Sequence, residues 1–82
     1  MVNYQLGLSF AMQQNWKLAE EHFSKVIGAD ERFAYAYYHR GRVWDKLGRK
    51  DKMLNDLDQF VKLAPSAPDA GKAMAILKAS GR

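Results

Sequence analysis

The pattern of apolar and small residues in this chain recurs after 34 residues. Gly7 recurs as Gly41, and the aromatic Phe10 recurs as Trp44. Other pairs at this offset share side-chain character: Tyr4 with Tyr38, Phe23 with Leu57, Val26 with Phe60, and Ile27 with Val61. Self-similarity at a fixed spacing of this length is typical of repeat proteins, in which each unit buries its apolar face against a neighbour.

The apolar spacing within each unit is that of an amphipathic helix. One set per unit follows the i, i+4, i+7, i+8 spacing of a single helix face: Ala19, Phe23, Val26 and Ile27, then Met53, Leu57, Phe60 and Val61. The pattern predicts helices over residues 2–13, 16–29, 31–47, 49–63 and 67–79. We therefore expect one all-α domain over residues 1–82. It would contain a repeat over 1–31, a second over 32–65 and a capping helix over 67–79.

Polar residues and glycine at the expected helix ends predict how each helix starts and stops. Asn15 is placed to cap the second helix and Asp30 to cap the third. Gly48 is placed to end the third helix. The segment Ser66-x-x-Asp69 has the form of a capping box for the last helix, with Pro68 inside its first turn.

Two glycines in the middle of expected helices favour stacked helix pairs. Gly7 and Gly41 each lie in the middle of an expected helix, where glycine costs about 1 kcal/mol relative to alanine. Their recurrence indicates that a partner helix approaches the backbone closely at both places.

The two units resemble the tetratricopeptide repeat (TPR) family. That family's pattern is an aromatic residue, a Leu-Gly pair, an aromatic residue, a small residue, an aromatic residue and a proline. The second unit fills these slots with Tyr37, Arg40-Gly41, Trp44, Met53, Leu57 and Pro65, and the first with Asn3, Leu6-Gly7, Phe10, Ala19, Phe23 and Glu31. The departures include Arg40 in the place of leucine. The resemblance implies a right-handed helical repeat whose packing residues are Gly7, Phe10, Ala19, Phe23, Tyr37, Gly41, Trp44, Leu57 and Pro65.

The same resemblance implies a concave groove lined by the first helix of each unit, and hence a non-catalytic protein-binding module. The corresponding groove positions are Tyr4, Leu8, Tyr35, Tyr38, Arg42, Lys72 and Ile76. Tyrosine offers contact area with a polar tip and arginine a planar fork for carboxylates, which favours a peptide or helix with acidic or aromatic groups. The competing interpretation is that the tyrosines only pack between helices. A clamp for chaperone tails is rejected, because its Lys and Asn positions hold Tyr4, Leu8 and His39 here.

Charge supports a lesser alternative, nucleic-acid binding. The chain carries 13 Lys and Arg against 9 Asp and Glu, a net charge of +4. Basic residues cluster at Arg40, Arg42, Lys46, Arg49, Lys50 and Lys52. Asp45 and Asp51 interrupt the cluster, and a solvated helix junction explains it equally well.

Enzymatic and metal chemistry find little support in the sequence. His22 and His39 fall on different expected helices without metal-ligand spacing, so we expect neither a metal nor another cofactor. Asp56 and Asp58 are two residues apart, thus on different helix faces, and we expect both to be solvated. The absence of cysteine excludes disulfides and thiolate metal sites. No signal peptide or membrane-length apolar run is seen, which favours the cytoplasm.

A structural alternative remains open. Two units and a capping helix are near the minimum for a stable stack, and no repeat covers the first helix. The sequence is therefore also compatible with a self-associating scaffold or a fragment of a longer array, joined through residues near Val2, Phe10 and Trp16.

Overall fold

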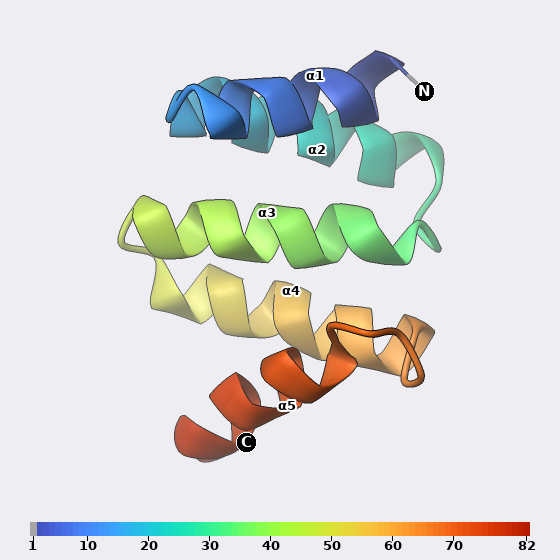
Figure 1. Ribbon diagram of the computed structural model, residues 1–82, viewed down its shortest axis with the longest axis vertical. Helices are drawn as coiled ribbons and strands as arrows, with labels where there is room; N and C mark the ends of the chain where they lie inside the picture. The colour runs from blue at the N-terminus through green and yellow to red at the C-terminus, as the bar shows by residue number, and fades with distance from the viewer. Residues whose placement is uncertain (1) are drawn as a thin grey trace.

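Five helices follow one another along the long axis of the computed structural model, which describes residues 2–82 (Figure 1). They are α1 (Val2–Met12), α2 (Trp16–Ala29), α3 (Ala34–Lys46), α4 (Lys50–Leu63) and α5 (Ala70–Ala79). No residue in the range 2–82 is in a strand. The all-α helical repeat predicted from the apolar spacing is therefore confirmed. No helix in this range has the length and apolar character that crossing a bilayer would need.

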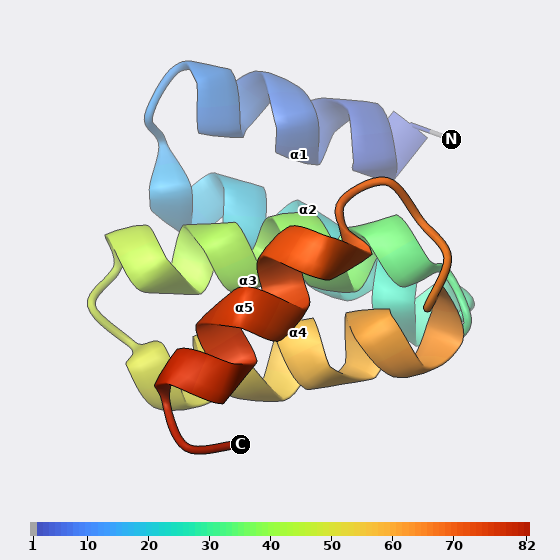
Figure 2. The same cartoon turned by 60° about the horizontal axis from the view of Figure 1, so that its bottom comes forward.

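The helices form two antiparallel hairpins and a closing helix. α1 packs on α2 and α3 on α4, while α2 and α3 join the two hairpins. α5 packs against α4 and crosses it obliquely (Figure 2). One buried cluster, made by α3, α4 and α5, consists of Tyr37, Met53, Leu57, Phe60, Ala70, Ala73 and Leu77. A smaller one joins the hairpins through Ala19, Phe23 and Val43.

The turns inside the two hairpins have the same backbone conformation. Gln14 and Gly48, 34 residues apart (14 and 48), both adopt positive φ, at 61° and 77°. In each turn the next residue donates a 2.8 Å backbone hydrogen bond to the carbonyl five residues earlier, Asn15 to Phe10 and Arg49 to Trp44. This is the Schellman arrangement that ends many helices. Gly48 ends α3 as predicted, whereas Gln14 adopts the same conformation at a cost of roughly 1 kcal/mol.

The predicted caps are correct for α2 and wrong for α3 and α5. The Asn15 side chain accepts a hydrogen bond from the Leu18 amide at 3.5 Å, as expected for an N-cap. Asp30 instead accepts from the Arg32 amide at 3.0 Å inside the connecting turn. Since that turn uses the carboxylate, α3 begins at residue 34 rather than 31, and Phe33 stands at its N-cap without a side-chain bond.

The start of α5 is displaced for a similar reason. Asp69 stands at the N-cap but makes no capping bond. Its carboxylate accepts a hydrogen bond from the Tyr35 hydroxyl at 3.2 Å, which ties the segment before α5 to α3. Ser66 and Pro68 consequently lie in the loop before the helix, and α5 begins at residue 70 rather than 67.

The two mid-helix glycines occupy equivalent surroundings. A Cβ atom on Gly7 would lie 2.7 Å from Cε1 of Phe23, and one on Gly41 would lie 3.3 Å from Cδ2 of Leu57. Phe23 and Leu57 are themselves related by the 34-residue offset (23 and 57). In each hairpin the absent side chain therefore lets the second helix approach the first.

The other expected packing residues differ in burial. Six are buried: Gly7, Ala19, Phe23, Tyr37, Gly41 and Leu57. Phe10 and Trp44 are half-buried and pack at the edges of the two clusters. Pro65 is exposed, so it acts on the chain by ending α4 rather than by filling the core.

We expect Gly7→Ala to lower the free energy of unfolding by about 1–3 kcal/mol, because the new methyl group overlaps the fully buried Phe23 ring. Gly28→Ala is the matched control. Within residues 2–82, no atom beyond the adjoining backbone of α2 lies within 4 Å of a Cβ at Gly28, so this change should stabilise α2 by up to about 1 kcal/mol. Urea unfolding of both variants measures this, and equal stabilities would contradict the close approach at Gly7.

Candidate functional site

The middle helix α3 presents polar residues on two opposite faces. Arg40 and Arg42 are two residues apart, which separates their side chains by about 200° around the helix axis. Arg40 points toward α2 and α4, whereas Arg42 lines a hollow shared with α1. The two faces of α3 therefore form two separate candidate sites.

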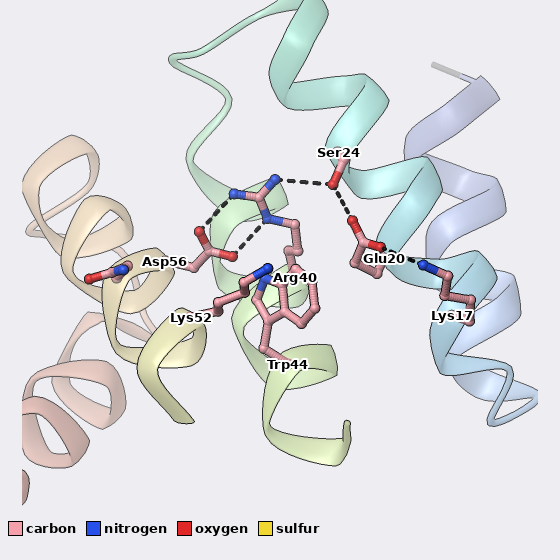
Figure 3. Close-up of a pocket in the computed structure, with 8 residues that line it drawn as sticks. Lys17, Glu20, Ser24, Arg40, Trp44, Lys52 and Asp56 are labelled. Atoms are coloured by element: carbon pink, nitrogen blue, oxygen red, sulfur yellow. Dashed lines mark hydrogen bonds and ion pairs between the residues drawn. The ribbon is translucent and has the colours of Figure 1, made fainter. Parts of the chain in front are cut away.

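On the face toward α2 and α4, a hydrogen-bonded network joins three helices (Figure 3). The Arg40 guanidinium donates to both carboxylate oxygens of Asp56, with Nε–Oδ2 at 2.7 Å and Nη2–Oδ1 at 2.8 Å. Its Nη1 donates to the Ser24 hydroxyl at 3.1 Å, and that hydroxyl donates to Glu20 at 2.6 Å. Bidentate pairs of this kind fix geometry as well as charge.

This network explains the unusual arginine in the leucine slot of the second unit. Arg40 extends from α3 and hydrogen-bonds to α2 and α4, so a charged side chain links the two hairpins at this position. The expectation that Asp56 is solvated is wrong, because Asp56 is only 5% exposed and both its oxygens are occupied. Asp58 is half-buried and pairs with Lys62 at 3.2 Å.

A polar hollow of about 470 Å³ opens beside this network. Lys17, Asn55 and Lys52 border it together with the network residues, and the Lys52 ammonium lies 4.5 Å from the centre of the Trp44 ring. That distance is a cation–π contact. The charges around this hollow are therefore largely engaged with one another.

On the opposite face, α1 and α3 enclose a second hollow of about 360 Å³. Its lining is mainly apolar with three basic or imidazole side chains: Leu8, Ala11, Met12, Trp16, His39, Arg42, Val43 and Lys46. Val43 is 1% exposed and belongs to the buried cluster that joins the hairpins. Among residues 2–82, no carboxylate lines this hollow.

His39 closes one side of the α1–α3 hollow within a row of aromatic rings. Its ring stacks on Phe23 with centroids 5.8 Å apart and lies 5.9 Å from Tyr4 and 5.3 Å from Tyr38. Burial, and then the positive charge of Arg42, lower the pKa of His39 below its usual 6.5. The imidazole is therefore uncharged at neutral pH.

The expected groove residues are distributed over three places. Leu8 and Arg42 meet in the α1–α3 hollow. The tyrosines are half-buried: Tyr4 packs on Phe33 at 4.8 Å, while Tyr35 and Tyr38 pack on Phe60 at 5.1 and 4.9 Å.

The remaining two groove positions are on the last helix. Lys72 and Ile76 are exposed on α5 and do not line the hollow. Lys72 lies 3.9 Å from Asp69.

The structure also divides the basic cluster of the nucleic-acid alternative. Arg40 is bound to Asp56, and Lys52 lies over Trp44. Arg49 pairs with Asp51 at 3.2 Å in the turn. Arg40 and Lys52 line the polar hollow, whereas Arg42 and Lys46 line the hollow on the opposite face of α3, so these four residues are divided between two faces.

Several lining residues were not expected at a binding site. The sequence places Trp16 at an expected association surface and Lys46 in the basic cluster, and it gives no role to Met12. Helix spacing could have found some of them, since His39 and Lys46 fall three before and four after Arg42 on the same helix face. Of the residues expected at an association surface, Val2 is 74% exposed and Phe10 stacks on His22 at 5.4 Å.

Two antiparallel helix hairpins with equivalent turns and equivalent close-approach glycines define a helical-hairpin repeat protein. A tetratricopeptide repeat model matches residues 2–29 and 35–67, which is more than half of the chain. The chain therefore belongs to the tetratricopeptide repeat family. Repeats of this family are generally protein–protein interaction modules, typically without catalytic activity. A search of curated proteins found no significant match.

We expect Asp56→Ala to lower the free energy of unfolding by about 2–3 kcal/mol, because it leaves Arg40 partly buried without its partner. The 20% exposure of Arg40 keeps the value below that of a fully buried pair. The double variant Arg40→Leu/Asp56→Ala should lose less, since no unpaired charge remains. Asp58→Ala, in a surface pair, should cost under about 1 kcal/mol. Thermal and urea unfolding of all three variants would contradict the role of the network if Asp56→Ala matched Asp58→Ala.

The lowered pKa of His39 predicts that acid destabilises the fold. Below pH 6.5 the unfolded chain binds a proton at this histidine, but the folded chain resists it until the pH falls through the lower folded pKa. Stability should therefore fall through that window, and His39→Gln should remove this component. Urea unfolding from pH 7.5 to pH 5 checks this, with His22→Gln as the control. Parallel curves for wild type and His39→Gln would contradict it.

Proposed function

We propose that this chain is a non-catalytic interaction module that binds a segment of a partner protein, as an extended peptide or a helix, along the face formed by α1, α3 and α5. Support comes first from the family, whose repeats generally bind proteins. It comes secondly from the α1–α3 hollow, which offers apolar surface beside exposed positive charge. Sites of this composition suit ligands that anchor an apolar side chain and orient it by a few polar contacts.

The observation that carries the proposal is the meeting of Leu8 and Arg42 in one hollow. These residues lie 34 apart in the chain (8 and 42), on the first helices of successive hairpins. The stack of repeats thus places an apolar contact and an arginine fork side by side. The Arg42 guanidinium also lies 5.8 Å from the centre of the Tyr38 ring, a contact that helps to hold its orientation.

The half-buried tyrosines have a supporting role in this proposal. Burial, and then the hydrogen bond to Asp69, raise the pKa of Tyr35, so its hydroxyl stays protonated and donates to Asp69. Tyr4 and Tyr38 flank His39. All three rings lie within about 6.0 Å of His39, which lines the hollow, and each is only partly buried.

Charge reversal of Arg42 tests the proposal. We expect Arg42→Glu to weaken capture of partner proteins from a lysate of the natural host by at least about fivefold, since it removes a charge pair and adds repulsion. Lys25→Glu, an exposed change on α2 with the same effect on net charge, should leave capture unchanged. Quantitative mass spectrometry of pull-downs with both variants measures this. Equal recovery with wild type and Arg42→Glu would overturn the assignment of this face.

A further inference from the structure

We infer that the α1–α3 hollow is a pocket for one large apolar side chain of the bound segment, and that Arg42 and Lys46 select an acidic residue next to that side chain. This inference rests on the proposed function and goes beyond it. It names the chemistry of the ligand and adds Ala11, Trp16 and Lys46 to the determinants of specificity.

The floor and walls of the hollow suit an apolar anchor. Val43 forms part of the buried cluster between the hairpins, and Leu8, Ala11 and Trp16 pack against that cluster. An apolar cavity of about 150 Å³ is large enough to bind benzene. The hollow measures about 360 Å³, so it has room for a leucine or an aromatic side chain.

Arg42 and Lys46 are free to pair with a ligand, unlike five other cations within residues 2–82. Arg40, Arg49, Lys17, Lys62 and Lys72 each lie within 4.0 Å of a carboxylate. Within residues 2–82, neither Arg42 nor Lys46 forms such a pair.

The facing helix and the third polar side chain of the lining add no negative charge to the hollow. The facing helix α1, VNYQLGLSFAM, contains no acidic residue. His39, the third polar group of the lining, is uncharged at neutral pH. The local charge is therefore positive and complements a ligand with a carboxylate beside its apolar anchor.

The polar hollow beside Arg40 is the contrasting case. Its arginine is bound to Asp56 and Ser24, and two carboxylates, those of Glu20 and Asp56, lie in its lining. Lys17 and Lys52 also line this hollow, but an acidic segment would have to compete with Glu20 for Lys17 and with Asp56 for Arg40. The two hollows therefore differ in the ligand chemistry that they favour, and acidic ligands are directed to the α1–α3 hollow.

Matched peptides test the inference by NMR titration of the ¹⁵N-labelled protein. Three synthetic peptides share a Gly-Ser background and differ at the centre, which reads Asp-Leu-Asp, Lys-Leu-Lys or Asp-Ser-Asp. The Asp-Leu-Asp peptide should bind at least about fivefold more tightly than the other two and lose affinity in 0.5 M salt. Its shifts should centre on the end of α1 and the second half of α3. Equal affinities, or shifts centred on α2 and α4, would overturn the inference.

Two variants locate the binding chemistry. Ala11→Phe fills the hollow and should weaken binding of the Asp-Leu-Asp peptide at least about tenfold. Lys46→Glu is an exposed change that leaves the core intact, and it should weaken binding about fivefold. Lys25→Glu on α2 is the control of equal charge and should leave binding unchanged. If Lys46→Glu binds like Lys25→Glu, the inference is wrong even if Ala11→Phe fails to fold.

The same variants separate this inference from the proposed function. If Arg42→Glu abolishes capture of partner proteins while Ala11→Phe and Lys46→Glu do not, the binding face stands and the anchor pocket is wrong. If none of the three changes capture, both are wrong. If all three reduce it, both are supported.

Discussion

Contact between one helix backbone and a bulky side chain of the next helix sets the geometry of this fold. At Gly7 the Phe23 ring lies where a Cβ atom would be, and at Gly41 the Leu57 side chain takes the equivalent place. Both hairpins close at the same position, and α2 of the first hairpin packs on α3 of the second. The first helices α1 and α3 then lie near each other and leave the apolar hollow between them. The candidate site is thus a consequence of how each hairpin closes.

Within residues 2–82, the central helix α3 carries a paired arginine on one face and unpaired basic residues on the opposite face. Arg40 is used inside the protein, where Asp56 and Ser24 hold it. Arg42, two residues further along, and Lys46, one turn later, line the hollow on the opposite face. The basic residues of α3, which look uniform in the sequence, are therefore divided by the helical twist between a face bound inside the protein and a face with unpaired charge.

The fold could be predicted from the sequence because its signals are local or repeated. The apolar spacing, the mid-helix glycines and Asn15 each act within one hairpin. The starts of α3 and α5 could not be placed, because Asp30 and Asp69 bind a turn amide and the Tyr35 hydroxyl instead of capping their helices. The burial of Asp56 depends on the packing of α4 against α3. Likewise, Leu8 and Arg42 were named from repeat positions, whereas Met12 and Lys46 border a hollow that exists only once two helices stack.

The Arg40 network also makes the two hairpins non-interchangeable. Its partners in the first hairpin are Ser24 and, through it, Glu20. The second hairpin has Asp58 and Leu54 at those positions (24 and 58, 20 and 54). A tandem of two second hairpins would thus set a carboxylate against the arginine where a hydroxyl now lies, and a tandem of two first hairpins would have Leu6 in place of Arg40. The network therefore forms only when the hairpin with Arg40 follows the hairpin with Ser24, although the two backbones are alike.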